Sequence, residues 1–152
     1  MVFRTMLLCY DGTREGRTAL KQGAELAYAC GAFVHLLAVV RTSATAIVAE
    51  SLSTDAPFRD QTQHVEEILH EGVARLTARG VRAEGHLALG EPLDEIVRAA
   101  HTFQVDLIVL GHRTQSGFAR WWRGDSVGVT LLDLSACSIL VCIENPRPET
   151  PP

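Results

Sequence analysis

Short apolar runs alternate along this chain with longer segments whose apolar residues recur at helical spacing. The short runs predict strands at residues 6–10, 33–40, 81–89, 107–110 and 138–143. The periodic segments predict helices at about residues 14–30, 61–79, 92–100 and 126–134. Regular alternation of strand and helix is typical of a parallel sheet with helices on both faces and right-handed crossovers. The sequence therefore predicts a single-domain, doubly wound α/β fold.

Residues with strong local preferences support these boundaries. Thr13 is placed to cap the first helix, Gly31 to end it, and Pro92 to stand in the first turn of a later helix. The segment 81–89 alternates apolar and polar residues, which favours a strand near an edge of the sheet. Residues 41–60 have weak periodicity and are expected to form a mobile excursion.

The ends of the chain differ in composition from its body. Residues 1–143 are expected to form the domain, and residues 144–152, with four of the six prolines, a Pro-rich disordered tail. The amino terminus leads into a strand and lacks the long apolar core of a signal peptide. No apolar run approaches the roughly 20 residues that span a bilayer. We therefore expect a cytoplasmic protein with no membrane partner.

Charge and cysteine usage narrow the function classes further. The net charge of −4 argues against a general nucleic-acid binder. The four cysteines form no C-x-x-C pair and have no zinc-like spacing with histidine, so a redox role is the minority interpretation. The six histidines are scattered singly, so the sequence gives no support for a metal site.

The segment that follows the strand at 107–110 carries the most suggestive chemistry. The strand is expected to stop at Gly111, and a basic loop with further glycines then leads to a helix that begins near Ser126. In an open parallel sheet, ligands bind where loops leave the carboxyl ends of strands. Glycines let a ligand approach the backbone, and a helix N-terminus favours an anion. The loop therefore predicts a phosphate-binding site.

Several motifs, taken in order, resemble the universal stress protein family over about residues 3–143. They are Asp11-Gly12-Thr13, Ala24-Glu25-Leu26-Ala27 with Gly31-Ala32, His35 to Val40, Gly90-Glu91-Pro92, Asp106 to Gly111, Ser126-Val127 and Ala136 to Val141. The resemblance implies an adenine-nucleotide α-hydrolase-like (Rossmann-like) fold with a five-stranded sheet of order 3-2-1-4-5. It also implies a homodimer, commonly paired through the last strand at 138–143. An apolar edge strand needs cover, and the alternative is cover by the chain's own tail.

Many members of this family bind ATP through Gly-x-x-Gly, nine residues, and Gly-Ser/Thr. This chain keeps the first and last glycines as Gly111 and Gly124, but Thr114 replaces the second glycine. Asp125 either replaces the hydroxyl residue or is an insertion that leaves Ser126 in that role. Thr114 adds a Cβ near a phosphate, and an inward Asp125 would repel it.

The resemblance also assigns roles to individual residues of the predicted ATP site. Asp11 would accept a hydrogen bond from the adenine amino group, Val39 or Val40 would contact the base, and Gly90 would lie near the ribose. A role for Asp11 as a turn or helix-cap carboxylate is an open alternative. The remaining candidates line the pocket or its phosphate end, where Mg²⁺ is a possible companion of ATP: Gly12, Thr13, Gly111, His112, Arg113, Thr114, Gly124, Asp125, Ser126 and Val127.

Two functions fit these patterns. The first is a nucleotide-binding regulatory dimer with a degenerate phosphate loop. The second is a dimer of the same fold that acts only through protein contacts. The sequence contains no Walker motif, nucleophile elbow or poised Ser-His-Asp set, so an enzyme such as a slow ATPase or phosphotransferase has the least support.

Overall fold

The computed structural model describes residues 2–41, 56–112 and 136–143. The described elements alternate along the chain: β1 (Thr5–Cys9), α1 (Arg14–Cys30), β2 (Phe33–Arg41), α3 (Ala56–Ala78), β3 (Ala83–Gly90), α4 (Pro92–Thr102), β4 (Leu107–His112) and β5 (Ser138–Ile143). The strands form one five-stranded sheet of order β3-β2-β1-β4-β5, and every neighbouring pair is parallel. The predicted fold class and strand order are therefore confirmed.

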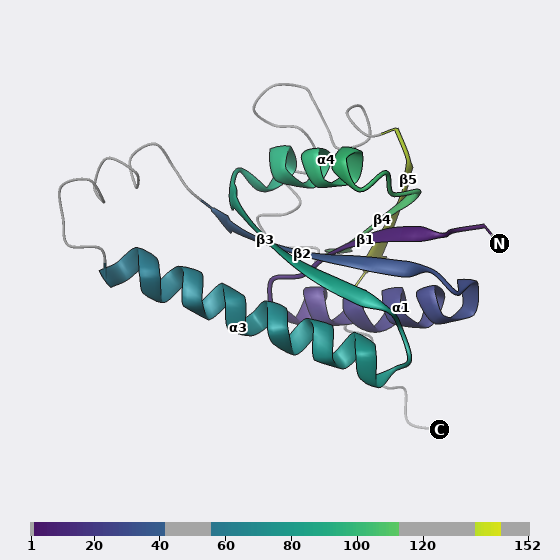
Figure 1. The fold of residues 1–152 in the computed structure, drawn as a ribbon, viewed down its shortest axis with the longest axis horizontal. Coiled ribbons are helices and arrows are strands. Elements are labelled where there is room, and N and C mark those ends of the chain that lie inside the picture. The colour runs from purple at the N-terminus through teal and green to yellow at the C-terminus, as the bar shows by residue number, and fades with distance from the viewer. Residues whose placement is uncertain (1, 42–55, 113–135, 144–152) are drawn as a thin grey trace.

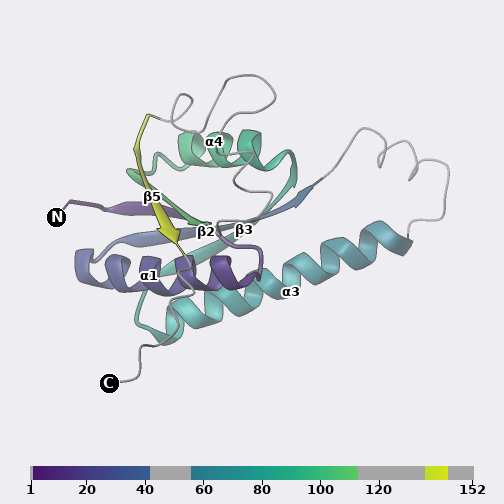
Figure 2. The ribbon, with the colours of Figure 1, turned by 180° about the vertical axis from the view of Figure 1, so that it is seen from behind.

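Helices cover both faces of this sheet. Helices α1 and α3 lie side by side on one face, and α4 lies on the other (Figure 1). Figure 2, from behind, shows β5 at one edge of the sheet and β3 toward the other side. None of the described helices is long and apolar enough to cross a membrane.

Alternation along the central strands divides the core into two layers. On β1, Met6 and Leu8 point toward α1 and α3, whereas Leu7 points toward α4. All three side chains are fully buried. The same division continues on β4, where Val109 joins the first layer and Ile108 the second. Strands buried on both faces need continuous apolar runs, which explains why the apolar pattern predicted them.

Small residues let α1 approach the sheet closely. Gly23 lies against Leu8 of β1, and a Cβ at Gly23 would collide with the Leu8 side chain. The helix begins where predicted, because the Thr13 side chain accepts a hydrogen bond from Gly16 N–H at 3.1 Å. It ends at Gly31, whose left-handed conformation (φ 65°) is the predicted C-cap.

The structure corrects several predicted boundaries. Helix α3 begins at Ala56, so the last residues of the expected excursion 41–60 are helical. Strand β4 continues to His112 because Gly111 and His112 still pair with Cys142 and Ile143 of β5. The prediction that the strand stops at Gly111 was therefore wrong. The predicted helix at 126–134 and the tail at 144–152 lie outside the described residues.

Candidate functional site

The candidate site lies at the carboxyl ends of the central strands. Strands β2 and β3 follow β1 on one side of the sheet, whereas β4 and β5 extend it on the other side. The strand order therefore reverses between β1 and β4. Such a switch point is where ligands bind in open α/β sheets, because the connections leave in opposite directions and open a crevice. The predicted residues that follow β1 and those that end β4 lie at the carboxyl ends of two neighbouring strands.

Asp11 forms a tight polar turn directly after β1. Its Oδ1 atom accepts hydrogen bonds from the backbone N–H of Thr13 at 3.0 Å and from the Thr13 hydroxyl. The turn role that the sequence left open for Asp11 is therefore present, whereas the helix cap is Thr13. Within the described part of the chain, no hydrogen bond reaches the second oxygen, Oδ2. The Asp11 side chain is exposed, so the turn leaves one carboxylate oxygen for another partner.

The backbone around this turn has little room for larger side chains. Gly12 has a φ of +77°, and a Cβ there would lie 3.2 Å from Ile68 of α3. A Cβ at Gly16 would come within 2.5 Å of Asp11 Oδ1. Glycine at position 12 allows the close approach of Ile68, and glycine at position 16 leaves room for the Asp11 carboxylate.

The two candidate valines of β2 face opposite sides of the sheet. Val39 is partly buried and belongs to the layer under α4. Val40 is only 1% exposed. Since Val40 has almost no free surface, Val39 is the better candidate for contact with a planar base.

Gly90 at the end of β3 stands against a buried carboxylate that the sequence did not single out. Glu95 of α4 is the only charged residue among the buried residues of the described chain. Its Oε1 atom accepts from Arg98 at 2.9 Å and would lie 2.7 Å from a Cβ at Gly90. Gly90 also has a φ of +150°, which side-chain-bearing residues rarely adopt. Glu95 therefore explains why this position at the end of β3 is glycine.

The phosphate end of the predicted site is described only in part. Gly111 is buried in the ladder between β4 and β5, and His112 is the last residue of β4. The predicted residues Arg113, Thr114, Gly124, Asp125, Ser126 and Val127 lie outside the described residues.

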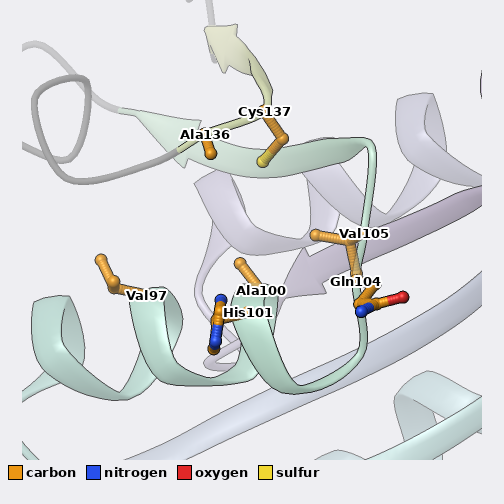
Figure 3. Close-up of a pocket in the computed structure, with 7 residues that line it drawn as sticks. All are labelled: Val97, Ala100, His101, Gln104, Val105, Ala136 and Cys137. Atoms are coloured by element: carbon orange, nitrogen blue, oxygen red, sulfur yellow. The ribbon is translucent and has the colours of Figure 1, made fainter.

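A separate pocket of about 250 Å³ lies between α4 and the start of β5. Figure 3 shows Val97, Ala100 and His101 of α4 on one side and Cys137 on the other. Gln104 and Val105, which lead from α4 toward β4, and Ala136 complete the lining. None of the predicted nucleotide residues lines this pocket. It lies near the amino end of β5, so it is not the predicted crevice.

All four cysteines are free thiols. Burial, followed by the negative charge of Asp11, raises the pKa of Cys9. Burial also raises the pKa of Cys142 and, together with the charge of Asp106, that of Cys137. A thiol with a raised pKa is a poor nucleophile at neutral pH.

The histidines are not all separate in the fold. The register of β2 and β3 brings His35 and His86 together, with Glu84 beside them. The scattered spacing in the sequence gave no sign of this cluster, because it depends on which residues of two strands pair.

Comparison with known proteins identifies a family that matches this chain. The universal stress protein family matches residues 3–142 of the chain. A curated relative, universal stress protein YxiE of Bacillus subtilis, is 33% identical over 147 residues, covering 92% of this chain and 99% of that protein.

Solved structures of the family share the fold. A universal stress family protein from Burkholderia pseudomallei has a TM-score of 0.71 at 24% identity, with 92% of this chain and 96% of that chain covered. An Arabidopsis thaliana family member with AMP bound has a TM-score of 0.64 at 17% identity, with coverage of 97% and 96%. This chain therefore belongs to the universal stress protein family.

Proposed function

We propose that this protein is a cytoplasmic regulatory protein that binds an adenine nucleotide, ATP in the first instance, at the switch point between β1 and β4. The observation that carries the proposal is the Asp11 turn: an exposed carboxylate, bonded to Thr13, directly after β1 at the switch point. A family member of the same fold has AMP bound, which supports an adenine nucleotide as the ligand class.

The adenine end of the proposed site uses residues at or just after the carboxyl ends of three strands. The adenine amino group would donate to Asp11 Oδ2, while Oδ1 keeps its bonds to Thr13. Val39 at the far end of β2 would contact the base. Gly90, at the end of β3, would lie near the ribose. Each contact needs only groups that the fold already fixes.

The phosphate end of the proposed site rests on sequence and on the position of β4. Gly111 and His112 end β4 next to the crevice. The basic loop that follows carries Arg113, whose guanidinium would form charge-assisted hydrogen bonds to phosphate. Thr114, Gly124, Asp125, Ser126 and Val127 complete the proposed contacts, with Mg²⁺ as a companion that would offset the Asp125 charge.

A melting-temperature series tests this proposal. A ligand of the native state raises the melting temperature, by an amount that grows with its concentration over the dissociation constant. The variant Asp11→Asn keeps an oxygen for Thr13 but turns an amide N–H₂ toward the adenine amino group. Asp60→Asn makes the same change at an exposed site on α3. Excess ATP should raise the melting temperatures of wild type and Asp60→Asn by the same amount. The rise for Asp11→Asn should be smaller.

The size of the expected difference follows from the bond that is lost. A hydrogen bond to a charged group contributes about 1.5–3 kcal/mol, so Asp11→Asn should weaken ATP binding by roughly 10- to 100-fold. Equal stabilisation of wild type and Asp11→Asn by ATP would show that Asp11 does not contact the nucleotide. No stabilisation of wild type at millimolar ATP would reject the proposal as a whole.

A second candidate function is a homodimer that acts through protein contacts without a nucleotide. Strand β5 is an edge of the sheet, and its last residue, Ile143, is 56% exposed. Open apolar edges favour pairing with another strand, and a two-fold pairing closes both edges. Whether or not ATP binds, we propose that the dimer forms through 138–143.

Sedimentation of two matched variants tests the dimer. Ile143→Lys places a charge on the β5 edge, and Leu89→Lys does the same on the opposite edge strand β3, where Leu89 is 50% exposed. We expect Ile143→Lys alone to shift the protein toward the monomer. A dimer that survives Ile143→Lys but not Leu89→Lys would place the interface on β3.

A further inference from the structure

A compact cluster of two histidines and one glutamate lies on β2 and β3, away from the proposed nucleotide site. His35 of β2 pairs directly with Glu84 of β3, and His86 follows Glu84 by two residues on the same face of the strand. The Nδ1 atom of His35 lies 2.9 Å from the Nε2 atom of His86. Each of the three residues offers one ligand atom, and these atoms all lie within 4.8 Å of one another.

Aromatic rings hold the two imidazoles in place. The ring of Phe103 at the end of α4 stacks on both histidines, with centroid distances of 4.2 Å to His35 and 4.2 Å to His86. Phe33 meets His35 edge-on at 5.0 Å. The histidines therefore stand on adjacent strands and against a common ring, so binding a metal would require little ordering of side chains. A small entropic cost of ordering the side chains favours a high affinity for the metal.

The donor set matches a borderline transition metal. Imidazole suits Zn²⁺, Ni²⁺ and Cu²⁺, whereas Mg²⁺ prefers oxygen ligands alone. Zn–N bonds of about 2.0–2.1 Å at a tetrahedral angle separate two nitrogens by about 3.4 Å. The observed 2.9 Å is a hydrogen-bonding distance about 0.5 Å shorter than that spacing, so a bound ion would replace the bond between the two imidazoles.

Exposure leaves the site accessible. His35 and His86 are partly buried, whereas Glu84 is exposed, so an ion can enter from the Glu84 side and keep water as a further ligand.

We propose that His35, Glu84 and His86 form a binding site for one divalent transition-metal ion, with Zn²⁺ as the representative. Two imidazole nitrogens and one carboxylate oxygen would bind the ion, and water would fill the remaining position, as in open three-ligand zinc sites. His35 lies near the start of β2 and Val39 four residues further along, a separation of about 13 Å at the rise of a strand. The metal site is thus separate from the nucleotide crevice.

Titration of the metal-free full chain with ZnCl₂ by calorimetry tests the site. We expect one ion per chain for wild type and no comparable heat with MgCl₂. The variant His86→Phe removes a ligand but keeps a ring to stack on Phe103, and Glu84→Gln removes the charge at an exposed position. Since even the partners of metal ligands contribute about 10- to 100-fold in affinity, each variant should weaken binding at least about tenfold.

Matched controls separate this site from incidental zinc binding. His101→Phe makes the same change at an exposed histidine of α4, and Glu66→Gln the same change at an exposed glutamate of α3. Both should bind Zn²⁺ like wild type. Bound Co²⁺ should show the visible absorption spectrum that is expected for nitrogen and oxygen ligands. Unchanged zinc affinity in His86→Phe, equal loss in His101→Phe, or a cobalt–thiolate absorption band would overturn the proposal.

Discussion

Gly90 and Glu95 fit each other at the rim of the proposed site: a Cβ on Gly90 would stand 2.7 Å from Glu95 Oε1. The backbone at Gly90 also has a φ of +150°, which disfavours any other residue. Gly90→Ala should therefore destabilise the fold by about 1–3 kcal/mol, measured as the free energy of unfolding in urea.

A second variant separates the two causes at Gly90. If the collision contributes, Gly90→Ala should lower the free energy of unfolding less in a Glu95→Ala background than in wild type. A loss caused by backbone strain alone should be the same in the two backgrounds. A fully additive double-mutant cycle would show that strain alone makes glycine necessary here.

Thr13 holds the first turn of α1 through a hydroxyl that both donates and accepts. It donates to Asp11 and accepts from the Gly16 N–H. Thr13→Ala should lower the free energy of unfolding by about 1 kcal/mol, the usual effect of losing an N-cap. Thr13→Ser keeps the hydroxyl and should cost much less. Equal losses in the two variants would show that the methyl group, not the hydroxyl, stabilises this turn.

Tyr10 carries a hydroxyl that is buried without a hydrogen-bond partner among the described residues. Removing an unpaired buried polar group relieves its desolvation penalty. Tyr10→Phe should therefore leave the melting temperature unchanged or raise it, in contrast to the usual loss from altering a buried side chain. A fall of several degrees on Tyr10→Phe would reveal a partner for the hydroxyl in solution.

Cys9 and Cys142 should react slowly with iodoacetamide in the folded protein. Burial raises both pKa values, with a further contribution from Asp11 at Cys9. The thiolate is the reactive form, and below the pKa its fraction grows about tenfold per pH unit. Peptide mapping by mass spectrometry should show alkylation at both positions still accelerating between pH 8 and about pH 9. A plateau of either rate below pH 8 would contradict the raised pKa.

The sheet could be predicted because its evidence is local. The apolar runs at β1 and β4 and the capping residues Thr13 and Gly31 depend on near neighbours in sequence, and all reappear in the structure. Errors arose at element ends. Gly111 reads as a turn residue in the sequence, yet its pairing with Cys142 keeps it in β4. Cross-strand pairing of this kind overrides local propensity.

The site could be predicted only in part, because much of it depends on distant contacts. The nucleotide role of Asp11 was implied by the family resemblance, and its alternative as a turn residue was already visible in Asp-Gly-Thr. Glu95 was missed because only the packing of α4 brings it to Gly90. His35 and His86 are 51 residues apart, and no periodicity predicts the register that joins them.

Isothermal titration of the purified full chain with ATP tests the central claim most directly. We predict saturable heat with one nucleotide per chain, together with affinity for Asp11→Asn that is lower by roughly 10- to 100-fold. Absence of heat for wild type at millimolar ATP, in a protein whose melting curve shows it to be folded, would contradict the account.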